Sequence, residues 1–137
     1  MARFLIDKSV LARMRSQSVV ERVRPIIESG DAVSCAIIDL EVLYSARSHE
    51  DLLETARRRR LAYDDVPLTP SVFDRALHIQ QRLAAHGKHR LPIPDLIIAA
   101  AAIEHGLTVL HYDADFELIA EVTDQPTEWV VPRGSVD

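Results

Sequence analysis

The chain has 137 residues, a length that suits one compact domain over residues 1–137 and leaves little room for a second. Hydrophobic residues make up 47% of the sequence and charged residues 27%, which favours a packed core and argues against disorder. The formal net charge of −5 argues against a broadly basic nucleic-acid surface, although metal-binding carboxylates would contribute to the same balance.

Neither the N-terminus nor any internal stretch has the pattern of a membrane or export segment. The longest apolar run, residues 96–103, is far shorter than the ~20 residues that span a bilayer. The apolar N-terminal stretch is interrupted at Asp7 and Lys8, which does not fit a secretory signal. The single cysteine, Cys35, excludes an internal disulfide. We therefore expect a cytoplasmic protein without membrane contact.

Short apolar runs and helical periodicities alternate along the chain. Strands are predicted over residues 3–7, 32–35, 63–68 (a strand or an extended link), 107–111 and 127–131. Helices are predicted after a Ser9 N-cap, over residues 19–28, 38–46, 49–62, 71–85 and 95–105, and from Asp113 or Asp115 to residue 120. This alternation predicts an α/β fold with a central parallel sheet flanked by helices, in which ligands bind at the carboxyl ends of the strands.

Acidic residues follow two of the predicted strands where those strands end. Asp7 comes directly after residues 4–6, and Asp113 and Asp115 follow the strand at 107–111. Each could instead be a helix N-cap or a turn residue. We assign Asp113 to the predicted site because it is nearer the strand end, and Asp115 to a capping or supporting position.

Two further acids lie in apolar surroundings. Asp95 opens a helix that is apolar almost all round, so we expect its carboxylate to be buried and to need a partner such as a metal ion. A simple interaction with the helix dipole is the alternative. Glu41 lies either at the rim of a buried helix face or in solvent, and Asp39 fits the N-cap of that helix better.

A single acidic site would form if the acids at the strand ends and on the helices converge: Asp7, Glu41, Asp95 and Asp113. Their mutual repulsion would require a cation, and Mg²⁺ prefers oxygen ligands of this kind. The expected chemistry is hydrolysis of a phosphodiester bond by metal-activated water. Ser9 could hydrogen-bond a carboxylate or the phosphate. The six histidines lack the paired spacing of a zinc site.

The strings FLIDKSVLAR, DLEVLYSAR and PIPDLIIAAAAIEHGLTVLHYDADFELIA resemble the PIN-domain toxins of the VapC type. The similarity covers nearly the whole chain, and residues 94–116 are its most specific part. The resemblance implies a PIN-like three-layer fold and a Mg²⁺- or Mn²⁺-dependent endoribonuclease. It also implies a homodimer and a cognate VapB-type antitoxin, encoded beside the toxin, that blocks the site.

The resemblance can be carried over residue by residue. The four acids of the family match the four catalytic candidates of this chain: Asp7, Glu41, Asp95 and Asp113. Asp115 matches an extra acid close to the metal, so the implied metal ligands are Asp7, Asp95, Asp113 and Asp115. Ser9 matches the small hydroxyl residue after the first acid. His111 is a departure, because the family commonly has Thr or Ser there.

Two groups of basic residues are candidate contacts for an RNA backbone or an acidic antitoxin segment. One is the block at residues 57–60, for which a solvated helix face is the alternative. The other consists of Arg82, Lys88 and Arg90.

Two other functions are compatible with parts of the pattern. An Asp-based phosphotransfer or phosphatase domain would use Asp7 as its nucleophile, but no second acid follows at Asp-x-Asp spacing. A catalytically silent PIN-like interaction module would keep the fold alone, and the intact set of acids argues against it.

Overall fold

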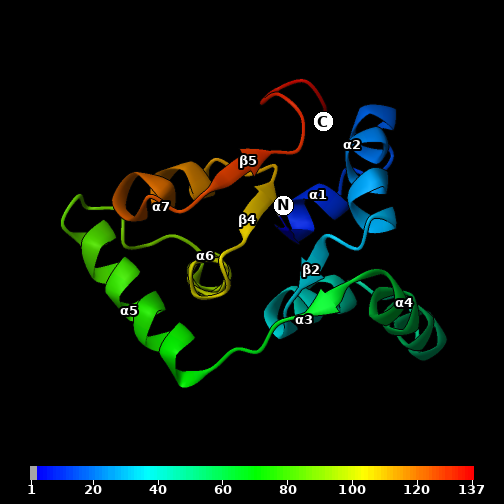
Figure 1. Cartoon of the computed structure of the whole chain (residues 1–137), viewed down its shortest axis with the longest axis horizontal. Helices are drawn as coiled ribbons and strands as arrows, with labels where there is room; N and C mark the ends of the chain where they lie inside the picture. The colour runs from blue at the N-terminus through cyan, green and yellow to red at the C-terminus, as the bar shows by residue number, and fades with distance from the viewer. Residues whose placement is uncertain (1–2) are drawn as a thin grey trace.

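The computed structural model describes residues 3–137 and contains a five-stranded sheet with helices on both faces (Figure 1). All strand pairs are parallel, in the order β3-β2-β1-β4-β5. The strands are β1 (Phe4–Ile6), β2 (Ala32–Ser34), β3 (Asp64–Asp65), β4 (Thr108–His111) and β5 (Thr127–Trp129). The helices are α1 (Lys8–Leu11), α2 (Gln17–Glu28), α3 (Ala36–Tyr44), α4 (His49–Ala62), α5 (Pro70–Ala84), α6 (Ile93–His105) and α7 (Asp115–Thr123). The predicted α/β class with a central parallel sheet is confirmed.

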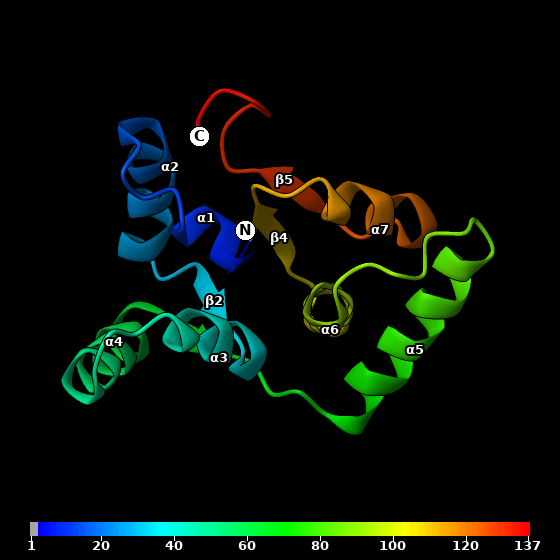
Figure 2. The same ribbon diagram turned by 180° about the vertical axis from the view of Figure 1, so that it is seen from behind.

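The two faces of the sheet carry separate hydrophobic clusters. Neighbouring side chains of β1 point to opposite faces, so Leu5 packs with α3, α5, α6 and α7, whereas Ile6 packs with α1 and α2. The views in Figures 1 and 2 agree that α5, α6 and α7 lie on one side of the sheet and α2 on the other. This arrangement gives the three layers that the sequence pattern predicts.

Helix α6 is apolar on nearly all sides because it lies between α5 and the sheet. Residues 99–102 are four alanines with no exposed surface. The helix ends at Gly106, whose φ of 65° is the left-handed conformation that commonly terminates helices. The burial of α6 brings its first turn, with Asp95, deep into the fold.

Three predicted capping positions are wrong. The N-cap of α7 is Ala114 rather than Asp113 or Asp115, and Asp115 is the first residue of that helix. The N-cap of α1 is Asp7 rather than Ser9, because the Asp7 carboxylate accepts a hydrogen bond from the Ser9 N–H. Helix α3 begins at Ala36, two residues earlier than predicted, after an extended Cys35. Asp39 therefore lies inside the first turn and is free to contact other elements.

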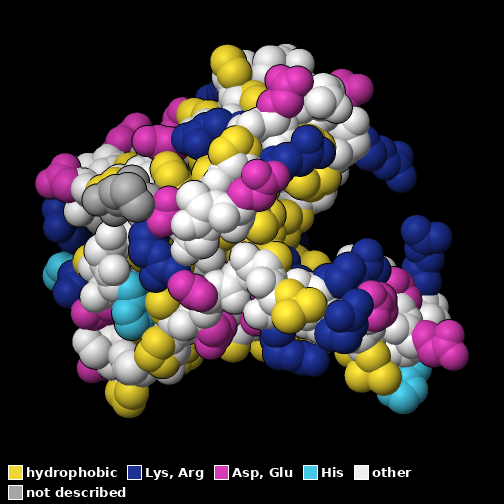
Figure 3. Space-filling model, turned by 45° about the vertical axis from the view of Figure 1, so that its right-hand side comes forward, with side chains coloured by type: hydrophobic (Ala, Val, Ile, Leu, Met, Phe, Trp, Pro, Cys, Tyr) yellow, Lys and Arg dark blue, Asp and Glu magenta, His cyan; other side chains and the backbone are white. Residues whose placement is uncertain are grey.

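The surface is hollowed between two projecting parts of the molecule (Figure 3). Comparison with Figure 1 places α2 above the hollow and α4 below it, with Lys and Arg side chains along its edges. None of the helices in residues 3–137 has the length and hydrophobicity of a membrane-spanning segment.

Candidate metal centre

The predicted acids lie at the carboxyl edge of the sheet, where β1 and β4 end side by side. Asp7 follows β1, and its backbone N–H donates to the carbonyl oxygen of Leu110 in β4, at 3.0 Å. Asp113 follows β4 by two residues, and Asp115 is the first residue of α7. Asp95 enters from the first turn of α6. Parallel pairing therefore brings together acids that are about a hundred residues apart in the chain.

Three of these acids form one compact group. Carboxylate oxygens of Asp95, Asp113 and Asp115 all lie within 4.8 Å of one another. Asp95 is buried, whereas the other two are half-buried. Oxygen atoms at this spacing can hold a divalent ion such as Mg²⁺ or Mn²⁺.

Burial and repulsion both act on the Asp95 carboxyl group. Its residue is 6% exposed, and burial raises its pKa to about 8, with a further contribution from neighbouring negative charges. Those charges come from the surrounding acids of the same edge: Asp7, Asp113, Asp115 and Glu41. Without a cation, Asp95 therefore holds a proton near neutral pH.

Asp7 lies beside this group and is 2% exposed. Its Oδ2 atom accepts the Ser9 N–H at 3.0 Å, which fixes the carboxylate as a helix cap. Burial raises the pKa of Asp7 and outweighs this hydrogen bond, which lowers it. The charges of Glu41 and Asp113 raise the pKa further. Asp7 is thus electrostatically coupled to the same site as Asp95.

Glu41 reaches the site from α3. Its Oε2 atom is 3.2 Å from the Lys8 ammonium, and its side chain is 16% exposed. Glu41 raises the pKa of Lys8, so the ammonium stays charged. The sequence patterns did not single out Lys8, although its place directly after the strand-end acid Asp7 was a usable signal.

Unpaired carboxylate oxygens show, independently of any family resemblance, that the site fits a divalent cation. One carboxylate oxygen of each of three acids is buried and has no hydrogen-bond partner among residues 3–137: Asp7 Oδ1, Glu41 Oε1 and Asp95 Oδ2. Buried polar atoms are nearly always paired, and an unpaired carboxylate oxygen is especially costly. A cation is the ligand that would satisfy such oxygens.

His111 supports the loop that carries Asp113. It is fully buried, and its Nδ1 atom accepts the Asp113 N–H at 3.2 Å. Burial lowers its pKa to about 4, which keeps the ring neutral and able to accept this bond. The Asp113 Oδ1 atom in turn accepts the Asp115 N–H at 3.0 Å. Imidazole nitrogen thus provides, in this chain, an acceptor for the backbone ahead of α7.

The basic residues predicted as RNA or antitoxin contacts differ in their exposure. Arg82 is exposed near the end of α5, and Lys88 and Arg90 are exposed in the loop that leads to α6. The block at residues 57–60 is divided, because successive residues of α4 point in different directions. Arg57 pairs with Glu54 at the surface, whereas Arg59 is buried.

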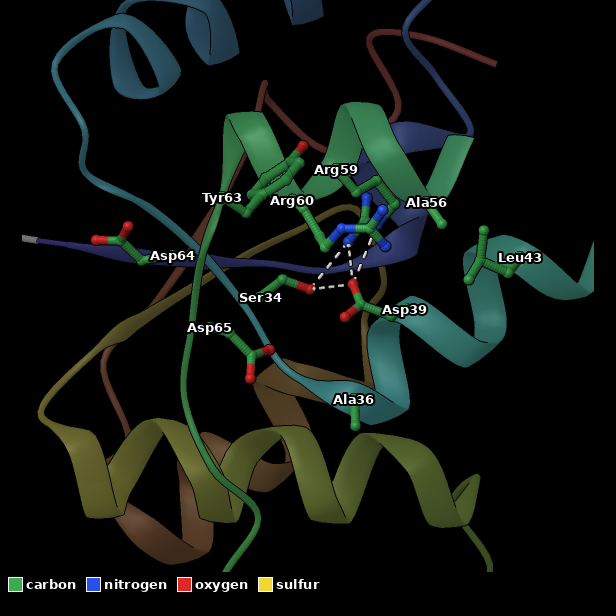
Figure 4. Close-up of a pocket in the computed structure, with 10 residues that line it drawn as sticks. All are labelled: Ser34, Ala36, Asp39, Leu43, Ala56, Arg59, Arg60, Tyr63, Asp64 and Asp65. Atoms are coloured by element: carbon green, nitrogen blue, oxygen red, sulfur yellow. Dashed lines mark hydrogen bonds and ion pairs between the residues drawn. The ribbon is translucent and has the colours of Figure 1, made fainter. Parts of the chain in front are cut away.

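Arg59 lies in a second polar cluster, at the end of β2 (Figure 4). It donates to Asp39 Oδ1 from Nη2 at 2.9 Å and from Nε at 3.1 Å, and Nη2 also donates to Ser34 Oγ at 2.9 Å. The cluster lines a cavity of about 510 Å³ between α3, α4 and β3. Here the Arg59 guanidinium neutralises the half-buried carboxylate of Asp39 within the chain.

The fold and the acidic edge together define a parallel α/β protein with a candidate divalent-metal centre. The sequence model of the PIN domain matches residues 4–122. The chain is 48% identical over 139 residues to the protein named Ribonuclease VapC51 of Mycobacterium tuberculosis, and 98% of each is covered. It is 49% identical over 136 residues to Ribonuclease VapC21 of the same species, with 97% of each covered. The chain belongs to the PIN domain family, which confirms the resemblance.

Solved structures of low sequence identity share the fold. A chain of the FitAcB structure from Neisseria gonorrhoeae aligns with a TM-score of 0.72 and 20% identity, over 93% of this chain and 97% of that chain. A chain of the DNA-bound VapBC structure from Salmonella typhimurium aligns with a TM-score of 0.75 and 17% identity, over 96% and 100%.

Proposed function

We propose that the protein is an endoribonuclease toxin of the VapC type, which hydrolyses RNA phosphodiester bonds with a divalent metal ion. The observation that carries the proposal is the set of buried, unpaired carboxylate oxygens at one sheet edge. Membership of the PIN family, with relatives named Ribonuclease VapC at 48% and 49% identity over nearly the whole chain, gives this site its reaction class.

The residues proposed to hold the metal are Asp7, Asp95, Asp113 and Asp115, with Glu41 as a further catalytic acid. Mg²⁺ is the proposed ion and Mn²⁺ a substitute, because both take hard oxygen ligands. Bound there, such an ion supplies positive charge at the scissile phosphate and acidifies a water molecule.

The protein's own groups prepare this site. Burial raises the pKa of Asp95 to about 8, so a cation held by this carboxylate would compete with a proton near neutral pH. The Ser9 N–H keeps one oxygen of Asp7 occupied and leaves the other for the site. Ser9 Oγ accepts the Tyr112 N–H at 2.9 Å, which ties α1 to the segment before Asp113. Ser9 therefore positions both Asp7 and the segment before Asp113, in addition to any contact with phosphate.

The deciding experiment measures cleavage of single-stranded RNA by the purified full chain with Mg²⁺, with Mn²⁺ and with EDTA. Cleavage is expected with either metal and is expected to disappear with EDTA or in Asp7→Asn. Circular dichroism verifies that the variant is folded. Cleavage that survives both EDTA and Asp7→Asn refutes a metal-dependent mechanism.

We also propose a VapB-type antitoxin as the natural inhibitor, because structures named as VapBC complexes share this fold. Co-expression with the small protein encoded beside the gene is expected to yield a complex that does not cleave RNA. Exposed Arg82, Lys88 and Arg90 are candidate contacts for either RNA or this partner. If reversing all three charges changes neither RNA cleavage nor antitoxin affinity, these residues belong to neither interface.

A homodimer is proposed as the functional unit. Phe73, Leu77 and Ile93 are 44%, 58% and 64% exposed and form one apolar region on α5 and the start of α6. Burial of such a region against a second copy is favourable. Leu77→Glu is expected to give a monomer in light scattering, whereas the matched Leu53→Glu on α4 is expected to leave the dimer intact.

A further inference from the structure

A pocket of about 520 Å³ opens next to the candidate metal centre, between the start of the chain and its C-terminal tail. It shares Ser9 and Asp113 with the acidic edge, so the two regions are continuous. Its other walls are the turn after α1, the loop between β4 and α7, the end of β5 and the tail: Arg13, Tyr112, Ala114, Trp129, Arg133, Gly134, Val136 and Asp137. The volume is in the range of small-ligand pockets.

The first feature of this tail pocket is an arginine without an acidic partner. Among residues 3–137, the Arg13 side chain makes one hydrogen bond, from Nη1 to the Ser9 carbonyl oxygen at 2.8 Å, and no ion pair. Its guanidinium lies 4.4 Å from the centre of the Tyr112 ring. A guanidinium has five N–H donors in a fixed plane that suits phosphate oxygens. Arg13 therefore keeps donors available for an anion.

The second feature is a pair of aromatic rings with an arginine over one of them. Tyr112 and Trp129 pack edge to face, with ring centroids 5.3 Å apart. The Arg133 guanidinium lies 5.6 Å from the Trp129 ring centre, and its side chain is 66% exposed. Aromatic rings and guanidinium planes are the surfaces on which unpaired nucleobases stack.

The third feature is a rigid frame behind these groups. The Tyr112 hydroxyl donates to the Val136 carbonyl oxygen at 2.9 Å and accepts the Gly134 N–H at 2.8 Å. These bonds hold the tail as one wall of the pocket. Trp129 Nε1 donates to Glu117, which fixes the orientation of the indole. A preformed surface of this kind reduces the ordering cost of binding.

Charge and shape together favour RNA over an acidic protein segment. The chain has a net charge of −5, yet two arginines face this pocket beside the acid site. A metal ion would offset the charge of Asp113, which leaves two acids near the arginines: Glu117, whose Oε2 atom is 3.9 Å from Arg133 Nη1, and Asp137. An acidic peptide would need the arginines only, whereas a nucleotide uses the arginines for phosphate and the rings for its base.

We propose that the tail pocket binds the nucleotide next to the scissile phosphate of single-stranded RNA, with phosphate on Arg13 and the base against Trp129 and Arg133. The proposal rests on the proposed ribonuclease function and adds a substrate subsite to it. Asp113 and Ser9, which border both regions, set the two subsites beside each other.

Trp129 is the only tryptophan in the sequence, so its fluorescence reports directly on the pocket. The experiment titrates a single-stranded RNA 12-mer into the full-length Asp95→Asn protein with Mg²⁺ and follows Trp129 emission. Saturable quenching is expected. Arg13→Gln, in the same background, is expected to weaken affinity about tenfold and to reduce the slope of log affinity against log salt by about 0.7.

Arg75→Gln is the matched control, because Arg75 is a residue of α5 and the ribbon views show that helix on a different side of the molecule from the C-terminal tail. It is expected to bind RNA like its parent. With Asp95 restored, Arg13→Gln and Arg133→Gln are expected to raise the KM for RNA cleavage with little change in kcat. In the same cleavage assay, Trp129→Phe is expected to raise the KM less than Trp129→Leu, since it keeps a ring.

If Arg13→Gln and Arg133→Gln both leave the RNA affinity unchanged, the proposal that the tail pocket binds RNA is wrong, even if the wild-type chain cleaves RNA. If the same variants bind the antitoxin more weakly but bind RNA as before, the proposal is also wrong, and the pocket is a contact site for the protein partner. If the wild-type chain cleaves no RNA with either metal, the ribonuclease proposal fails. Quenching of Trp129 by RNA then still decides whether the pocket binds nucleotides.

Discussion

Two clusters of acidic side chains lie at the same carboxyl edge of the sheet, and the chain treats them in opposite ways. At the end of β2, Asp39 receives two hydrogen bonds from Arg59 and one from Ser34 Oγ at 2.8 Å. At the ends of β1 and β4, Asp7 and Asp95 each retain a buried oxygen without a partner among residues 3–137. A carboxylate neutralised within the chain supports structure, whereas an unneutralised group of them is available to an external cation.

The largest expected effect is loss of activity when one unneutralised acid is removed. Asp95→Asn should reduce RNA cleavage at saturating Mg²⁺ by about 1000-fold, or about 4 kcal/mol of barrier, because a metal ligand is lost. The same change should leave the melting temperature in EDTA unchanged or higher, since it relieves repulsion. Single-turnover cleavage and calorimetry test both expectations. A large drop in melting temperature would mean that Asp95 is structural.

Removing the Arg59 guanidinium, which supplies the positive charge of the cluster at the end of β2, should instead lower the stability of the fold. Arg59→Met should lower the free energy of unfolding by about 2 kcal/mol, because Asp39 and Ser34 lose charge-assisted hydrogen bonds in a half-buried setting. Urea titration measures this loss. Adding Asp39→Leu to Arg59→Met should restore part of the stability, since no unpaired charge remains. A double variant less stable than the single one would contradict the ion-pair interpretation.

The two clusters should also differ in their response to pH. The folded state raises the pKa of Asp95 from 3.8 to about 8, so between these values it holds a proton that the unfolded chain has released. Stability in EDTA should therefore fall as pH rises, by about 2 kcal/mol between pH 6 and pH 8. Asp95→Asn should flatten this dependence. Stability that rises over this range in EDTA would contradict the prediction.

The smallest effect is expected where a carboxylate and an arginine meet in solvent. Arg57 pairs with Glu54 at 2.7 Å, but both side chains are about half exposed. Exposed pairs add little because water and salt screen them. Arg57→Gln should leave the melting temperature unchanged in low and high salt. A clear drop at low salt would show that α4 depends on this pair.

The sequence predicts the acids at the strand ends better than the acid that reaches the site from a helix. Asp7 directly follows an apolar strand and Asp113 lies two residues after another, and parallel sheets place such residues at one edge. Glu41 lacks a comparable local signal, because helical spacing alone allows both the site and solvent. Its assignment depended on family resemblance, and the structure places it 3.2 Å from Lys8.

The Arg59 cluster and the tail pocket were not predictable from local patterns. Arg59 and Asp39 are twenty residues apart on different helices, and Asp39 was expected to cap its helix instead. Arg13 and Trp129 meet in one pocket through the ordering of β1, β4 and β5 in the sheet. Contacts of this type depend on tertiary packing, which neither periodicity nor capping preference encodes.

The four alanines of α6 make a prediction about mutational tolerance. Residues 99–102 have no exposed surface, so a larger side chain there must push α6 away from α5 or from the sheet. Such a displacement would carry the first turn of the helix, with Asp95, out of register with Asp113. A saturation screen for toxicity should therefore recover inactive variants at these alanines, although none of them can take part in the chemistry.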